Sequence, residues 1–156
     1  MKQVKKYFLP FVLFVSILYL DQLTKLVTEN WLTYRNSYEV IQDFFWIYIL
    51  RNTGGAWSLF SGVDGIFMIV PPLALAFMVY FYLTSKDSQK LFRWALILLM
   101  AGTLGNYIDR LHFGYVRDFL SFNLFGYMFP VFNVADISLN IGVALLILET
   151  LLEGKK

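Results

Sequence analysis

The chain has 156 residues, of which 58% are hydrophobic and only 15% charged, and its formal net charge is +2. Globular proteins average about 25% charged residues, so this composition excludes an ordinary soluble domain and indicates an integral membrane protein. The basic residues form no continuous stripe that could follow the phosphate backbone of a nucleic acid, so no nucleic-acid partner is expected.

The supply of chemically reactive side chains is narrow. The chain has no Cys and a single His, His112. These counts exclude thiol nucleophiles and zinc sites built from Cys or several His ligands. We therefore expect no metal and no cofactor. Carboxylates, hydroxyls, amides and Lys are the side-chain groups that remain for catalysis.

Four apolar stretches predict membrane-spanning helices at about residues 7–27, 66–85, 91–110 and 134–152, all within one domain covering residues 1–156. Residues 66–85 carry no charge, and about 20 such residues cross a bilayer core. Pro71 and Pro72 are expected in the first two turns of that helix, where a missing amide donor costs least. The first stretch resembles a signal peptide but lacks a small-x-small cleavage site, so we expect it to be retained.

The positive charges predict the orientation. With both termini cytoplasmic, eight Lys and Arg residues lie on that side and five on the other. The positive-inside rule favours this arrangement.

The outer segments, about residues 28–65 and 111–133, are rich in aromatic and β-branched residues, including the β-prone run 38–50, and are expected to form strands. The predicted fold is thus a membrane all-α protein with a small β-sheet on its outer surface.

Residues 118–122 and 127–132 predict a β-hairpin around a four-residue loop. If Phe122 pairs with Tyr127, Asp118 lies opposite Val131, five residues before Asp136. Pro130 cannot donate to a ladder, so its strand is expected to be an edge or to break there.

Two carboxylates brought close together share a proton, and such a pair can activate water while hydrogen-bonding a peptide carbonyl. This chemistry is that of an aspartic peptidase, with Asp118 and Asp136 as its dyad.

Further polar residues are predicted at the same depth. Each could be a helix cap or a surface ion pair, but ionisable groups near hydrocarbon are costly and usually functional. Small residues, Gly102, Gly105, Gly142 and Ala144, would let the helices approach closely. The predicted polar cluster comprises Asp21 and Lys25 on the first helix, Asn106, Asp109 and Arg110 on the third, and Asn133, Asp136 and Asn140 on the fourth.

Three alternatives remain open. A Ser–Lys peptidase could use Lys25 with one of Ser37, Ser58, Ser61, Ser121 or Ser138, although no spacing singles one out. A transporter or proton relay could use the same carboxylates. A scaffold for other membrane proteins would explain the small and aromatic residues but not the collected carboxylates.

Five motifs in order along nearly the whole chain resemble those of the lipoprotein signal peptidases, also called type II signal peptidases. They are DQLTK at 21–25, RNTGGAW at 51–57, GNYIDR at 105–110, VRDF at 116–119 and FNVADISLNIG at 132–142. One departure is Gly55, since the family usually has Ala-Ala after Gly54.

The resemblance implies that Asp118 and Asp136 are the catalytic dyad, and that a supporting or substrate-binding set surrounds it. It also implies a bacterial plasma-membrane enzyme with its site near the extracytoplasmic face. The implied substrate is a diacylglyceryl-modified prolipoprotein cut just before its lipidated Cys, the implied partners include membrane lipids, and globomycin-type antibiotics are the implied inhibitors. The implied supporting set is Asp21, Lys25, Asn52, Gly54, Asn106, Asp109, Arg110, Asn133 and Asn140.

Overall fold

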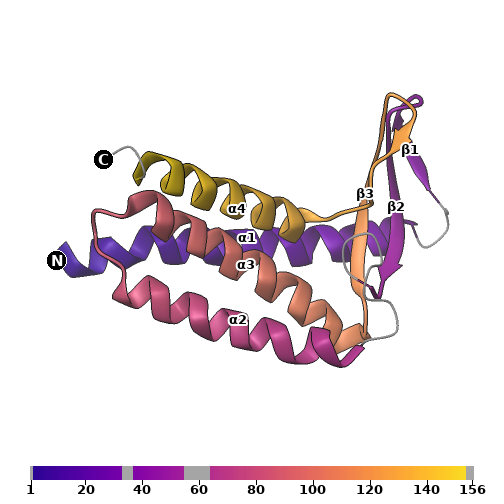
Figure 1. The fold of residues 1–156 in the computed structure, drawn as a ribbon. Helices are drawn as coiled ribbons and strands as arrows, with labels where there is room; N and C mark the ends of the chain where they lie inside the picture. The colour runs from indigo at the N-terminus through magenta and orange to yellow at the C-terminus, as the bar shows by residue number, and fades with distance from the viewer. Residues whose placement is uncertain (1, 33–36, 55–63, 154–156) are drawn as a thin grey trace.

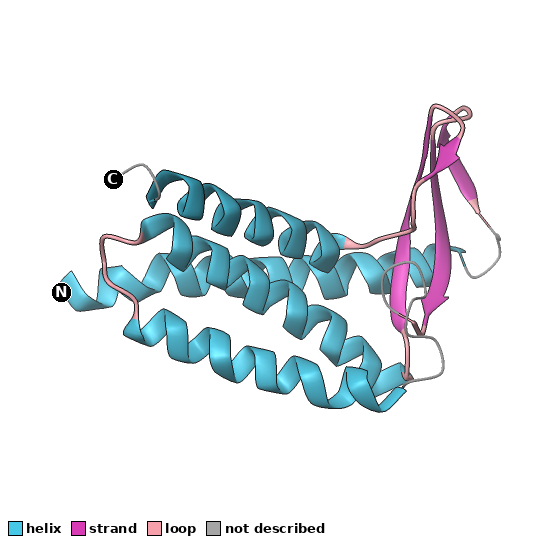
Figure 2. Ribbon diagram, viewed as in Figure 1, coloured by secondary structure: helices cyan, strands magenta, loops and turns pink. Residues whose placement is uncertain are grey.

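Four long helices form a bundle, and a four-stranded antiparallel sheet stands across one end of it (Figures 1 and 2). The computed structural model describes residues 2–32, 37–54 and 64–153. The helices are α1 (Lys2–Trp31), α2 (Asp64–Thr84), α3 (Lys90–Phe113) and α4 (Val134–Glu153), and each is long and apolar enough to cross a membrane. The predicted architecture is therefore confirmed.

Helix α2 begins earlier than the sequence suggested, which changes the setting of its two prolines. Because α2 starts at Asp64, Pro71 and Pro72 lie in its third turn, so the expectation that they lie in the first two is wrong. Pro72 has no amide hydrogen to donate to the carbonyl of Met68. The Tyr107 hydroxyl of α3 donates to that carbonyl instead, at 3.4 Å.

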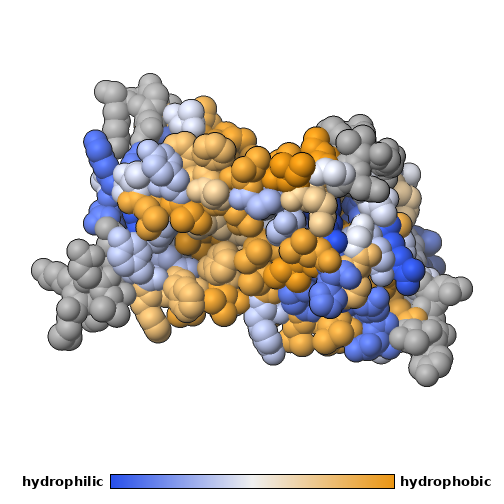
Figure 3. All heavy atoms as spheres, turned by 90° about the horizontal axis from the view of Figure 1, so that it is seen from below, coloured by the Kyte–Doolittle hydropathy of each residue, from blue (hydrophilic) through white to orange (hydrophobic). Residues whose placement is uncertain are grey.

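Helix α3 is the centre of the bundle. In the most apolar 18-residue stretch of each helix, half of the residues are buried in α3, against 6% in α1 and in α2 and 17% in α4. Leu96, Ile97 and Met100 of α3 pack with Tyr82 of α2 as a core. The outer helices leave large apolar side chains exposed around the middle of the bundle, while hydrophilic residues gather toward its ends (Figure 3). Such a belt of exposed apolar side chains suits the hydrocarbon core of a lipid bilayer.

Helices α3 and α4 approach each other closely at glycines. A methyl group on Gly102 would meet the Ala135 carbonyl oxygen at 2.5 Å, and one on Gly142 would meet Leu99 at 2.8 Å. A methyl on Gly105 would meet an Asp21 carboxylate oxygen of α1 at 2.6 Å. The three glycines predicted to permit close contact do so here, whereas Ala144, the fourth predicted small residue, is exposed.

The sheet has the order β1-β2-β3-β4, formed by β1 (Tyr38–Ile41), β2 (Phe45–Asn52), β3 (Val116–Leu124) and β4 (Tyr127–Met128). The β-prone run 38–50 is not one strand, because a turn between β1 and β2 interrupts it. At this turn Asp43 has φ of 55° and its amide donates to the Glu39 carboxylate at 2.7 Å. Asp readily adopts that conformation.

The predicted β3–β4 hairpin exists, but its loop length and register were wrong. Leu124 pairs with Tyr127, so the loop has two residues rather than four. Both have positive φ, 55° at Phe125 and 91° at Gly126, as a type I′ turn requires. The bridge between Leu120 and Phe132 shows that Asp118 does not lie opposite Val131, and its strand partner is Leu50 of β2. Strand β4 is one of the two edge strands of the sheet and ends before Pro130, as expected.

Candidate active site

Asp118 and Asp136 border the same cavity, of about 430 Å³, where the sheet meets the bundle. Asp118 lies within β3, and Asp136 lies in the first turn of α4. The hairpin leads the chain from one to the other, since Phe132 returns to β3 through a bridge with Leu120 just before α4 begins. Arg110 and Asn140 line the same cavity.

Each carboxylate oxygen of the pair accepts one hydrogen bond from an N–H group. Asn133 Nδ2 and Asn52 Nδ2 donate to the two oxygens of Asp118, at 2.6 and 2.8 Å. Asn106 Nδ2 and the Asn133 backbone amide donate to the two oxygens of Asp136, at 2.7 and 3.1 Å. Both carboxylates are therefore held as acceptors, and each oxygen keeps further acceptor capacity for a proton or water.

The start of α4 fixes Asp136. Asn133 precedes the helix, its side-chain oxygen accepts from the Asp136 amide at 2.9 Å, and the Asp136 carboxylate accepts from the Asn133 amide in return. This reciprocal pair is a capping box. The Ala135 amide donates to Asp21 of α1 at 2.9 Å, which ties the same helix start to the first helix.

The surroundings of Asp118 favour its protonated form. Burial raises the pKa of the Asp118 carboxyl to about 7, and the charge of Asp136 contributes to the rise. The amide donors Asn52 and Asn133 and the positive charge of Lys25 oppose this change in pKa. This raised pKa favours a proton on Asp118 up to about neutral pH, in the direction expected for neighbouring carboxyls.

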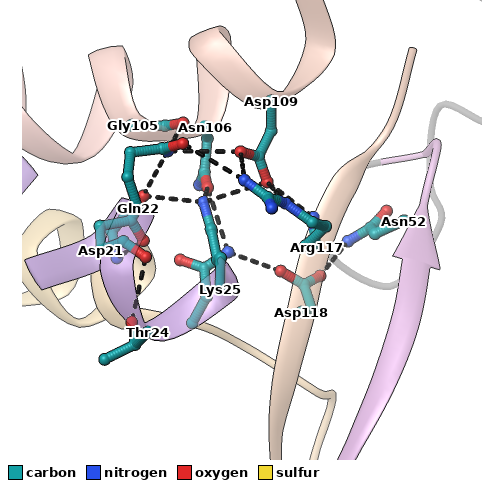
Figure 4. A network of polar contacts seen from close by, with 12 residues as sticks. Asp21, Gln22, Thr24, Lys25, Asn52, Gly105, Asn106, Asp109, Arg117 and Asp118 are labelled. Carbon is teal, nitrogen blue, oxygen red and sulfur yellow. Dashed lines mark hydrogen bonds and ion pairs between the residues drawn. The ribbon is translucent and has the colours of Figure 1, made fainter. Parts of the chain in front are cut away.

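Behind the pair lies a buried charged network, with Asp21, Lys25 and Asp109 all 0% exposed (Figure 4). Lys25 Nζ donates to Asp21 Oδ2 at 2.8 Å and to Asn106 Oδ1 at 3.0 Å, and it lies 3.4 Å from Asp109 Oδ2. Buried charges are costly unless paired, and here each has an opposite partner. The sequence-predicted pair of Asp21 and Lys25 is thus buried rather than solvated.

Three residues of this network were missed by the sequence reasoning: Gln22, Glu29 and Arg117. Arg117 donates three hydrogen bonds to Asp109, from its amide, Nε and Nη2, and one to Glu29 at 3.1 Å. Burial acts to lower the pKa of Arg117, but these acidic partners outweigh it and raise the pKa. Gln22 Nε2 donates to Asp21, Asp109 and the Gly105 carbonyl. The position of Arg117 directly before Asp118 in the VRDF motif was the available signal.

The remaining predicted residues lie at the margin of the site. Gly54 donates its amide to Asn52 Oδ1 at 3.1 Å, and Asn140 Nδ2 donates to the Asp136 backbone carbonyl at 2.8 Å. Neither touches a dyad carboxylate through an interaction observed here. The Arg110 guanidinium lies 4.4 Å from the Phe67 ring centroid. Among the described residues its buried Nε has no hydrogen-bond partner.

The Ser–Lys alternative has little geometric support. The observed oxygen partners of Lys25 are Asp21, Asn106 and Asp109, and Ser138 donates instead to the Leu98 carbonyl. Ser58 and Ser61, like Gly55, lie outside the described residues. Within those described ranges, no group of three or more His, Cys, Asp or Glu side chains could hold a metal ion.

Comparisons with known proteins converge on one family. A family model described as signal peptidase (SPase) II matches residues 13–152. The lipoprotein signal peptidase of Staphylococcus carnosus (strain TM300) is 42% identical over 97% of each chain, and that of Staphylococcus haemolyticus (strain JCSC1435) is 44% identical over 94% of each.

Two solved structures of bacterial membrane enzymes resemble the fold throughout. One has a TM-score of 0.82 and 38% identity, covering 93% of this chain and 88% of its own. The other has a TM-score of 0.81 and 40% identity, covering 91% and 92%. The sequence and the three-dimensional comparisons thus each cover most of the chain.

Proposed function

The chain belongs to the signal peptidase II family, which makes it a multi-pass protease of the bacterial membrane, and from that premise we propose its chemistry and substrate. It is an aspartic endopeptidase that removes the signal peptide from diacylglyceryl-modified prolipoproteins, cutting just before the lipidated Cys. The observation that carries this proposal is the pair of amide-bound carboxylates bordering one cavity.

The chemistry follows from the protonation of the pair. With one proton shared between Asp118 and Asp136, the ionised member accepts a proton from water as its oxygen attacks the scissile carbonyl carbon. The protonated member donates a hydrogen bond to the carbonyl oxygen. On collapse of the tetrahedral species the C–N bond breaks and a proton goes to the departing amine. The pair titrates as a unit, so the roles belong to the dyad.

The cavity suits a substrate that is peptide at one end and lipid at the other. Its polar lining includes Asn52, Arg110 and Asn140, while Pro71, Phe129 and Leu139 add apolar surface. The signal-peptide helix and the acyl chains would enter sideways from the bilayer, with the sheet holding the substrate near the membrane surface. Membrane lipids border the same opening, and inhibitors of the globomycin type would occupy it.

The deciding experiment is prolipoprotein cleavage by wild-type enzyme, Asp118→Asn and Asp136→Asn. Each variant removes a group from the proton-sharing pair, so cleavage should fall by at least about 10²-fold, the smaller contribution typical of general acid–base groups. Asp43→Asn is the matched control, because Asp43 is exposed in the β1–β2 turn and Asn tolerates its positive φ.

Two further arms separate the alternatives. Cleavage should persist with a chelator such as EDTA, since the dyad needs no metal. Full activity in either dyad variant would refute the proposed dyad, and dependence on Lys25 in that case would favour a Ser–Lys enzyme. Proton flux through proteoliposomes without cleavage would instead support a proton relay.

A further inference from the structure

The orientation of three asparagine side chains determines what the dyad meets. An amide has a donor end and an acceptor end, and a 180° flip exchanges them without changing its shape. All three amides that touch Asp118 or Asp136 present their NH₂ end. Something on the other side of each amide must select this orientation.

For two of the three side-chain amides, a backbone N–H group fixes the orientation. Gly54 N–H donates to Asn52 Oδ1 at 3.1 Å, and Asp136 N–H donates to Asn133 Oδ1 at 2.9 Å. A backbone N–H is a donor at every pH, so the oxygen of each side chain must face it. Asn52 and Asn133 are thus oriented by the fold itself.

Asn106 is oriented differently, by two side-chain donors, one of which carries a charge. Its Oδ1 accepts from Lys25 Nζ and from Asn133 Nδ2, both at 3.0 Å. A lysine ammonium has three donor hydrogens and no acceptor. A flipped Asn106 would therefore place its NH₂ against two donors and its oxygen against the Asp136 carboxylate.

We propose that Lys25 is a positioning residue that acts on the dyad through Asn106, by fixing its NH₂ end toward Asp136. This inference rests on the proposed function. Lys25 is 0% exposed and its observed oxygen partners are Asp21, Asn106 and Asp109. Its positive charge also favours an ionised dyad member, so one side chain both orients a donor and supplies a field.

Removal of the Lys25 charge leaves the buried Asp21 carboxylate without its ion-pair partner, so Lys25→Met should lower the free energy of unfolding, while the remaining hydrogen bonds keep the site assembled. Asp21 keeps hydrogen bonds from the Ala135 amide and Gln22, and Asp109 keeps its three from Arg117. Lys25→Met is therefore a suitable test, with Lys86→Met at the exposed α2–α3 connection as the matched control. Purified folded enzyme should show a kcat about 10- to 100-fold lower, the loss typical when a partner that orients a metal ligand is replaced, with KM nearly unchanged.

The pH profile separates positioning from mere structure. Without the Lys25 charge the pKa of Asp118 should rise further, which moves the alkaline limb of kcat/KM, where the pair loses its last proton, to higher pH. The control Lys86→Met should keep the wild-type profile. A loss of activity that only follows the folded fraction, with an unshifted limb, would assign Lys25 a structural role and overturn the inference.

A second variant tests the donor directly. Asn106→Asp keeps the shape but replaces the NH₂ facing Asp136 with an oxygen that donates only when protonated. Activity should be low at neutral pH and partly recover as the pH falls, unlike a pH-independent loss. Asn123→Asp is the matched control, because it retains the oxygen that accepts from the Gly126 amide in the hairpin.

The outcomes distinguish the two proposals. Wild-type kcat and pH profile in both Lys25→Met and Asn106→Asp would overturn the positioning role, even with Asp118→Asn and Asp136→Asn inactive in the same assay. Activity in those dyad variants would instead overturn the proposed function. A lowered kcat with a shifted alkaline limb in Lys25→Met, together with acid recovery in Asn106→Asp, would support the positioning role.

Discussion

Asp118 lies in surroundings that oppose its negative charge, and this affects stability as well as chemistry. Its pKa is raised to about 7 by burial and by Asp136, against about 3.9 in an unfolded chain. Between these values the folded state binds a proton that the unfolded state has released. By linkage, the contribution of Asp118 to the free energy of unfolding therefore falls as the pH rises from about 4 to about 7.

We expect the Tm of the wild-type protein in detergent to decrease between pH 5 and pH 8 more steeply than that of Asp118→Ala, which lacks the titrating group. Thermal unfolding across this range measures the difference in slope. Equal slopes would show that Asp118 has an ordinary pKa in the folded state.

The same titration predicts a bell-shaped pH dependence of kcat/KM. The alkaline limb should lie near pH 7 or above, where the pair loses its last proton, because a fully ionised dyad cannot donate to the substrate carbonyl. Activity that stays constant up to pH 9 would contradict a shared proton.

At the scale of helices and strands, short-range spacing predicted more than long-range pairing did. The separations of Asn133, Asp136 and Asn140 placed them on one helix face, and the capping box follows from the first two. The register of the β3–β4 hairpin was missed because Phe-Gly is not a strong type I′ signal in sequence. The Arg117–Asp109 contact was missed because it depends on how β3 leaves α3 through the left-handed Gly114.

Packing of α3 against α4 yields a prediction about stability. Gly102→Ala places a methyl group 2.5 Å from the Ala135 carbonyl oxygen, a backbone atom that cannot rotate away. Such overpacking costs about 1–3 kcal/mol. The shift also reaches the Ala135 amide, which binds Asp21, and the adjacent Asp136.

We therefore expect Gly102→Ala to lower Tm and to reduce cleavage by the protein that remains folded. Gly65→Ala is the control, since a methyl group there meets nothing within 4 Å and helix propensity favours Ala. Thermal unfolding and cleavage assays on both variants decide the point. Equal stability of the two variants would show that α3 and α4 separate at little cost.

Across the whole molecule, both described ends of the chain and the α2–α3 connection lie at the end of the bundle opposite the sheet (Figure 1). Eight of the 13 Lys and Arg residues fall at that end by the predicted topology. By the positive-inside rule we predict that the sheet and the cavity lie at the extracytoplasmic face. Composition alone supported the membrane class, but the position of the cavity required the folded chain.

The absence of Cys makes this orientation directly testable by labelling. Phe125→Cys lies at the hairpin turn, where Phe125 is 108% exposed, and Ser88→Cys lies in the exposed α2–α3 connection. A membrane-impermeant maleimide should label the first in intact cells and the second only after permeabilisation. The reverse pattern would invert the proposed topology.

The capping box at the start of α4 has a practical consequence for capturing uncleaved substrate. Asp136 is both a member of the proposed dyad and part of the N-terminal cap of α4, so replacing it alters the helix start as well as the reaction. Asp118 has no part in a helix cap, and its carboxylate receives only side-chain amides. An inactive enzyme intended to retain its substrate for structure determination is therefore best made at Asp118.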